Sequence, residues 1–164
     1  MPECFFVSDL HGHTDRYDKL FKAISGEPPA AIFLGGDLLP HDGKLKQAMS
    51  LSHRDFVNDY LAENFRKLRG QLGEAYPSVF LILGNDDARY QEAAILAAAG
   101  EGIWSYIHNR KINFREYEVY GYAMVPPTPF RLKDWERYDV SRFVDPGCIS
   151  PESGWYTVPV SENI

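Results

Sequence analysis

Three short apolar runs in this chain each lead into polar residues that are good metal ligands. The runs are residues 5–7, 32–34 and 79–83, and the segments that follow them are residues 8–11, 35–37 and 84–87. Short apolar runs bounded in this way are typical of buried parallel strands. Because parallel strands end at one edge of an open α/β sheet, where ligands bind, the sequence predicts an α/β fold with polar residues gathered at that edge.

The order of the predicted elements supports this fold class. A helix is expected from Thr14, which can cap it, with apolar residues at helical spacing: Tyr17, Leu20, Phe21 and Ile24. It separates strands predicted over 3–7 and 30–34, so these strands should be parallel with a right-handed crossover. A longer helical stretch over 45–68 precedes a strand over 78–83, and a third helix is expected over 88–99.

The pattern changes after residue 100. Segments 103–107, 111–114 and 118–125 are short, aromatic and roughly alternating, which predicts meandering or hairpin strands on the far side of a mixed sheet. Residues 126–164 contain repeated prolines and predict a loop-rich tail with one short helix within 131–143. We expect the whole chain, 1–164, to form a single domain, because this length is enough for one core.

Charge and cysteine content narrow the class of protein. The net charge of -6 disfavours general binding to nucleic acids or anionic membranes. Two cysteines do not form a disulfide framework, and no signal sequence precedes the first predicted strand, so we expect a cytoplasmic protein. No apolar run reaches the length of a membrane span.

Four residues at the predicted strand ends have the chemistry of metal ligands. Asp9 and His11 lie two residues apart, and an extended backbone would place both side chains on one side. Asp37 can bridge two ions through its two oxygens, and Asn85 adds a neutral oxygen. Divalent ions would relieve repulsion between the Asp9 and Asp37 carboxylates and activate a water for attack on phosphorus. Taken singly, each segment also fits an ordinary turn.

Together, the segments Asp9-x-His11, Gly36-Asp37 and Gly84-Asn85 resemble the calcineurin-like metallophosphoesterase superfamily. The strings at 8–12 and 35–41 and the prolines after Tyr120-Gly121 strengthen this resemblance over about the first 130 residues. It implies an α/β/β/α sandwich of mixed sheets and hydrolysis of phosphate monoesters or diesters. It also implies two ions (Mn, Fe, Zn or Ni), with Asp9 and His11 on the first, Asp37 bridging and Asn85 on the second.

Two departures from the family pattern affect these expectations. Asp86 stands where the family usually has a histidine that contacts phosphate, so we assign Asp86 the candidate catalytic position and favour a diester or activated ester. The family's late motifs, a lone histidine and then Gly-His-x-His, have no counterpart, and no histidine follows Val125. The chain thus resembles an N-terminal portion. Either a second half or a second polypeptide supplies the remaining ligands, or the protein is a natural short form.

Three further residues are candidates for binding a phosphate-ester substrate: His13, His41 and Arg89. The alternatives are that both histidines are polar loop residues and that Arg89 pairs with Asp86 or Asp87. His53 is expected to be exposed and His108 to lie in a turn. A different class of function also fits, namely a non-catalytic scaffold with a degenerate site, which Asp86 and the missing histidines favour.

Overall fold

The computed structural model describes residues 1–41 and 55–158, and its central element is a four-stranded parallel sheet with the order β1-β2-β3-β4. The strands are β1 (Cys4–Val7), β2 (Ala31–Gly35), β3 (Ser78–Ile82) and β4 (Ser105–Tyr106). The first three confirm the predicted strands and their parallel pairing. Their carboxyl ends therefore point to one edge, as the α/β class requires.

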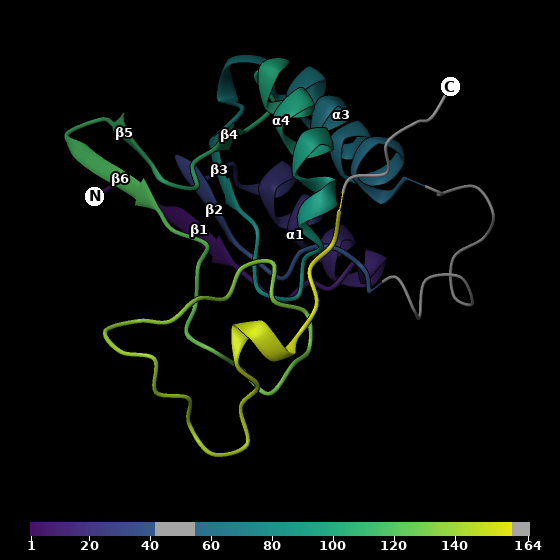
Figure 1. Ribbon diagram of the computed structural model, residues 1–164. Helices are drawn as coiled ribbons and strands as arrows, with labels where there is room; N and C mark the ends of the chain where they lie inside the picture. The colour runs from purple at the N-terminus through teal and green to yellow at the C-terminus, as the bar shows by residue number, and fades with distance from the viewer. Residues whose placement is uncertain (42–54, 159–164) are drawn as a thin grey trace.

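Helices cover one face of this sheet (Figure 1). They are α1 (Thr14–Gly26), the π-helix η1 (Phe56–Ala62), α3 (Glu63–Leu72) and α4 (Glu92–Gly100), with short 3₁₀ turns η2 (Gly73–Ala75) and η3 (Arg89–Gln91). A further 3₁₀ turn, η4 (Pro151–Ser153), lies in the loop-rich tail. In α1 the predicted stripe is confirmed, because Tyr17, Leu20 and Ile24 are buried against the sheet. The part of the 45–68 helix before Asp55 lies outside the described residues.

The start of α1 differs from the prediction. Thr14 is the first helical residue rather than the cap, and His13 occupies the cap position without a side-chain hydrogen bond. The cap backbone is held instead by the loop before it, where the amide of His13 donates to the carbonyl of Leu10 at 2.9 Å. The loop that carries the site therefore fixes this helix end.

A β-hairpin covers part of the opposite face of the sheet. Strands β5 (Arg110–Phe114) and β6 (Tyr117–Gly121) pair antiparallel, and the Phe114 ring lies edge-on to Phe80 with centroids 5.6 Å apart. These two strands confirm the predicted hairpin. The segment 103–107 was expected in the same meander, but its strand β4 pairs parallel with β3. Within the described residues, each sheet is thus purely parallel or purely antiparallel rather than mixed.

The hairpin leaves an aromatic side chain exposed on β1. Phe5 and Val7 pack into the helix-side core, so Phe6 between them points to the opposite face. Its side chain is 72% exposed. The hairpin's apolar contacts are instead with residues of β2, β3 and the segment after β4: Ala31, Phe33, Phe80, Ile82 and Ile107.

Residues 123–158 are loop-rich, as predicted, but the helix expected within 131–143 is absent. The segment Lys133–Glu136 is buried instead, and its acidic side chains accept hydrogen bonds from Thr128 and Thr157. Lys133 and Glu136 form a fully buried ion pair at 2.5 Å, and Asp134 accepts from the Thr157 amide at 2.8 Å. The contact of Asp134 with Thr157 joins residues far apart in the chain, which no single helix over 131–143 would provide. No helix among residues 1–41 and 55–158 is long and apolar enough to cross a bilayer.

Candidate metal centre at the strand ends

The loops after β1 and β2 stay paired beyond the ends of the strands. The Asp9 amide donates to the Gly36 carbonyl at 3.1 Å, and the His11 amide donates to the Asp37 carbonyl at 2.8 Å. Asp9, His11 and Asp37 all have left-handed backbones, with φ of 58°, 46° and 52°. Such conformations cost about 1–3 kcal/mol each and cluster at functional sites, where surrounding contacts enforce them. The expectation of an extended backbone from Asp9 to His11 is therefore wrong, although the two side chains do approach each other.

Two glycines allow the second and third loops to touch. A Cβ atom on Gly36 would lie 2.7 Å from the Cα of Gly84, and one on Gly84 would collide with the Asp37 carboxylate. Gly36 also has a φ of 96°, which favours glycine. This close approach lets an Asp37 oxygen accept a hydrogen bond from the Asp86 amide at 2.9 Å. Asp37 is thus fixed between the two loops.

Asp9, His11 and Asp37 form the first group of potential ligands. One ligand atom from each lies within 4.8 Å of the others, and His11 Nε2 is 3.9 Å from an Asp9 oxygen. Burial raises the pKa of Asp37, and the Asp86 and Asp9 carboxylates add to this, while the Asp86 amide and His11 oppose it. Facing carboxylates that disfavour each other's charge suit a divalent cation, so these residues fit the ions that the resemblance implies.

The group opens toward solvent on one side. The Asp9 side chain is 66% exposed, against 26% for His11. Asn85 is half-buried in the turn that the Asp87 amide closes on the Gly84 carbonyl at 3.1 Å. Three of the four predicted ligands therefore lie together, and Asn85 occupies the adjoining loop. Its role as a ligand remains a prediction.

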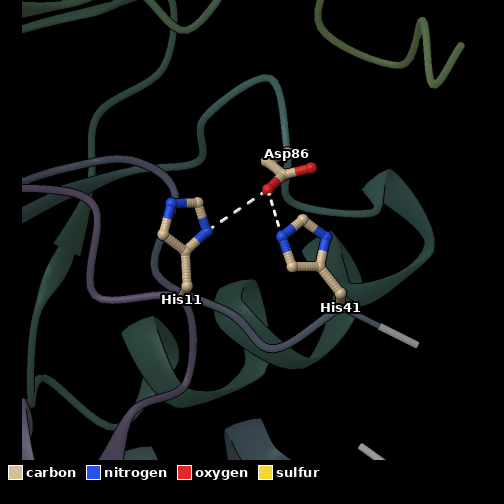
Figure 2. Close-up of side chains that lie close together, drawn as sticks. All are labelled: His11, His41 and Asp86. Carbon is tan, nitrogen blue, oxygen red and sulfur yellow. Dashed lines mark ion pairs between the residues drawn. The ribbon is translucent and has the colours of Figure 1, made fainter. Parts of the chain in front are cut away.

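A second group shares His11 with the first (Figure 2). One Asp86 oxygen lies 3.2 Å from His11 Nδ1 and 2.6 Å from His41 Nε2. The two imidazole rings are stacked, with centroids 5.3 Å apart. Sequence analysis named His41 and Asp86 for separate roles, in substrate binding and catalysis, and missed that they meet. No spacing in the sequence brings them together, because each lies in a different loop.

Asp87 lies beside this group but has a supporting role that sequence analysis also missed. Its side chain is fully buried and accepts three backbone hydrogen bonds, from Leu38 at 3.2 Å, Leu39 at 2.7 Å and Gly84 at 2.8 Å. Burial raises the pKa of Asp87 to about 7, and these three amides oppose that rise. Asp87 therefore ties the loop after β3 to the loop after β2.

The remaining substrate-binding candidates lie outside both groups. His13 is exposed at the start of α1. The Arg89 guanidinium lies 4.9 Å from the Trp135 ring centroid and 3.4 Å from a Glu92 oxygen, so its ion pair is with Glu92 rather than with Asp86 or Asp87. Substrate binding by His13, His41 and Arg89 remains a prediction. His53 lies outside the described residues.

His108 is part of the support beneath the site. Its Nδ1 accepts a hydrogen bond from the Ala123 amide at 3.0 Å, and its ring lies edge-on to Trp135. The Trp135 indole in turn donates to the Asp87 carbonyl at 2.9 Å. The turn position predicted for His108 thus carries a structural contact as well.

Comparison with known proteins agrees with this arrangement. The family model of calcineurin-like phosphoesterases matches residues 4–147. The chain therefore belongs to the calcineurin-like phosphoesterase family, whose members are phosphoesterase-type hydrolases that typically bind divalent metals.

The other two comparisons add less. A search of curated proteins found no match. One solved crystal structure is similar over 82% of this chain, with 20% sequence identity and a TM-score of 0.46. The alignment covers 55% of that protein, so the present chain spans about half its length.

Proposed function

We propose that this protein hydrolyses phosphate esters with the help of divalent metal ions bound at the strand ends. The observation that carries the proposal is the convergence of Asp9, His11 and Asp37 within 4.8 Å, in a chain of the calcineurin-like phosphoesterase family. Carboxylate oxygens and imidazole nitrogens together suit Mn, Fe, Zn or Ni. Asn85, in the adjoining loop, is the proposed neutral ligand of a second ion.

The proposed reaction is direct attack of water on phosphorus. Ions bound here would lower the pKa of a coordinated water and polarise the phosphoryl oxygens. The chain's own contribution is to hold the ligands in place: the Asp86 amide fixes one Asp37 oxygen, and the paired loops fix Asp9 and His11. The exposed side of Asp9 leaves room for substrate to reach the centre.

A diester or activated ester is the proposed substrate class. The Asp86 carboxylate lies at the centre, where it repels a dianionic phosphate monoester more strongly than a monoanionic diester. An activated ester also needs less help from a proton donor as its alcohol departs. The catalytic role of Asp86 itself remains part of the proposal.

The test compares the wild-type chain with Asp37→Asn in Mn²⁺, using bis-p-nitrophenyl phosphate and p-nitrophenyl phosphate. Asparagine keeps an oxygen that can accept from the Asp86 amide, so the fold should survive. We expect a loss of bound Mn²⁺ and an activity loss of about 100-fold or more, because even outer-shell changes cost about 10–100-fold. Asp139→Asn, at an exposed carboxylate, is the matched control. Unchanged metal content in Asp37→Asn contradicts the proposal.

A second candidate function is a protein-interaction module that has kept a partial site. The observation that favours it is Phe6, which is 72% exposed on the sheet face opposite the helices. A large exposed aromatic side chain of this kind is common at protein interfaces. Metal binding without hydrolysis of either ester, under Mn²⁺, Fe²⁺, Zn²⁺ or Ni²⁺, would favour this function over catalysis. A second polypeptide or C-terminal half as the partner remains a proposal.

A further inference from the structure

The group formed by His11, His41 and Asp86 has the chemistry of a metal site in its own right (Figure 2). It contains two imidazole nitrogens and one carboxylate oxygen, a set that binds zinc and other first-row transition metals. Asp86 lies between the two rings, 3.2 Å from His11 Nδ1 and 2.6 Å from His41 Nε2. Two of these three residues, His41 and Asp86, are outside the ligand set proposed above.

Distances between the three ligand atoms suit a shared ion. Zinc bonds to nitrogen and oxygen are about 2.0–2.2 Å long, so two ligand atoms of one ion lie at most about 4 Å apart. All three ligand atoms lie within 4.8 Å of one another, and the two contacts of the Asp86 oxygen, at 3.2 and 2.6 Å, are shorter than about 4 Å. An ion entering between these atoms would need the 2.6 Å contact of Asp86 with His41 to widen to about 3 Å, the separation of adjacent ligands at these bond lengths.

The strongest indication of a bound ion comes from His11 Nδ1. It is buried, and although an Asp86 oxygen is 3.2 Å away, Nδ1 makes no hydrogen bond within the described residues. A buried polar atom without a hydrogen-bond partner is costly to the fold. An ion in front of Nδ1 and Asp86 would satisfy both atoms, whereas the present direct contact satisfies the nitrogen poorly.

The two loops that carry His41 and Asp86 are held together by the buried Asp87. Its carboxylate binds the amides of Leu38 and Leu39, close to His41 in the chain, and it directly follows Asp86. The Asp86 amide is also tied to Asp37. Both ligands are therefore presented by backbone that is fixed independently of any ion, which is the preorganisation that a metal site requires.

We propose that His11, His41 and Asp86 bind one divalent transition-metal ion, with His11 coordinating through Nδ1. The proposal goes beyond the function proposed above, because it requires neither Asp9 nor Asp37 and no hydrolysis. A neutral imidazole gives a metal only one nitrogen and keeps a proton on the other, so this ion and the ion at Asp9 compete for His11. Coordination also removes the repulsion between Asp86 and an incoming phosphate.

The experiment removes the first group and leaves the second intact. The full chain carrying Asp9→Asn and Asp37→Asn is titrated with Zn²⁺ by calorimetry, and with Co²⁺ while its visible absorption is recorded. The asparagine at 37 keeps the acceptor for the Asp86 amide. We expect this parent to bind one equivalent of either ion, with the strong visible bands of Co²⁺ in a low-coordinate nitrogen and oxygen site.

Single changes in that parent identify the ligands. His41→Ala and Asp86→Asn should each weaken Zn²⁺ binding by more than about tenfold and diminish the Co²⁺ bands, since even outer-shell partners contribute about 10–100-fold. Asp139→Asn removes an exposed carboxylate from the loop-rich tail and should leave Zn²⁺ affinity unchanged. Thermal unfolding of the metal-free variants checks the fold, and because the His41 side chain is 45% exposed its variant should unfold like the parent.

Two results would overturn the proposal: a parent that binds no ion, or a His41→Ala variant with the affinity and Co²⁺ spectrum of the parent. Neither result bears on the proposed esterase, which is tested in the wild-type background through Asp37. In the same way, an Asp37→Asn variant with unchanged Mn²⁺ content contradicts the esterase proposal and leaves this one standing. The two proposals therefore fail separately.

Discussion

Asp86 and Asp87 are neighbours in the chain, but their carboxylates lie in two regions with different surroundings. Asp87 belongs to the support region beneath the loops, where its buried carboxylate accepts three backbone hydrogen bonds and its carbonyl accepts one from Trp135. Asp86 belongs to the ligand region, where its carboxylate faces the imidazoles of His11 and His41. In the support region, backbone and side-chain hydrogen bonds satisfy the polar groups. In the ligand region, side chains that could bind a metal face one another instead.

This difference separates residues that hold the site from residues that do its chemistry. A buried carboxylate surrounded by amide donors stabilises the fold, because removing it leaves those donors without partners. Carboxylates and imidazoles that face each other in a half-exposed group stabilise the fold little and gain most from a cation. Mutation of Asp87 should therefore lower the stability of the fold, whereas mutation of Asp86 should mainly weaken metal binding.

The largest expected effect is on stability at Asp87. Asp87→Ala leaves the amides of Leu38, Leu39 and Gly84 without their acceptor, and at about 1–3 kcal/mol for each donor we expect a loss of at least about 3 kcal/mol in the free energy of unfolding. Urea unfolding of the metal-free protein, followed by circular dichroism, measures this loss. Asp86→Ala is the matched neighbour and should change the free energy of unfolding by less than about 1 kcal/mol. Equal losses in the two variants would erase the distinction between the regions.

A smaller effect is expected from His108, the imidazole of the support region. Burial lowers the pKa of His108 below its ordinary value of 6.5, Arg89 and Arg137 lower it further, and Glu92 opposes them. Since the folded state favours the neutral ring, its contribution to stability is present above pH 6.5 and is lost as the pH falls through the lowered pKa.

His108→Asn tests this pH dependence. Asparagine offers an oxygen in place of the Nδ1 acceptor for the Ala123 amide but does not titrate in this range. Between pH 7 and pH 5, the free energy of unfolding should fall less steeply in the variant than in the wild type. Parallel pH profiles for the two proteins would show that His108 is not held neutral by the support region.

Much of the fold follows from local pattern. Apolar runs that end in glycine or polar residues identified β1, β2 and β3, and the spacing of Tyr17, Leu20 and Ile24 identified α1. These features depend on residues close together in the chain, where periodicity is informative. The helix expected within 131–143 failed for the opposite reason, because Asp134 and Glu136 find partners at Thr157 and Thr128 rather than in a helix.

The candidate site divides in the same way. The set Asp9, His11 and Asp37 was found from sequence because each residue follows its own strand, and parallel strands end at one edge. The contact of His41 with Asp86 was missed because it depends on how two loops fold back, which the Gly36–Gly84 approach and the buried Asp87 determine. The close approach of Gly36 to Gly84 and the burial of Asp87 have no signature in the spacing of residues along the sequence.

The most direct test of the account is anomalous X-ray diffraction from wild-type crystals grown in excess Mn²⁺, with data collected on both sides of the manganese absorption edge. The account predicts at least one strong anomalous peak within coordination distance of the Asp37 carboxylate, in contact with Asp9 or Asn85. A peak at His41 and Asp86 would locate the additional ion. Crystals saturated with Mn²⁺ that show no anomalous peak near Asp37 would contradict the central claim, that these strand ends form a metal centre.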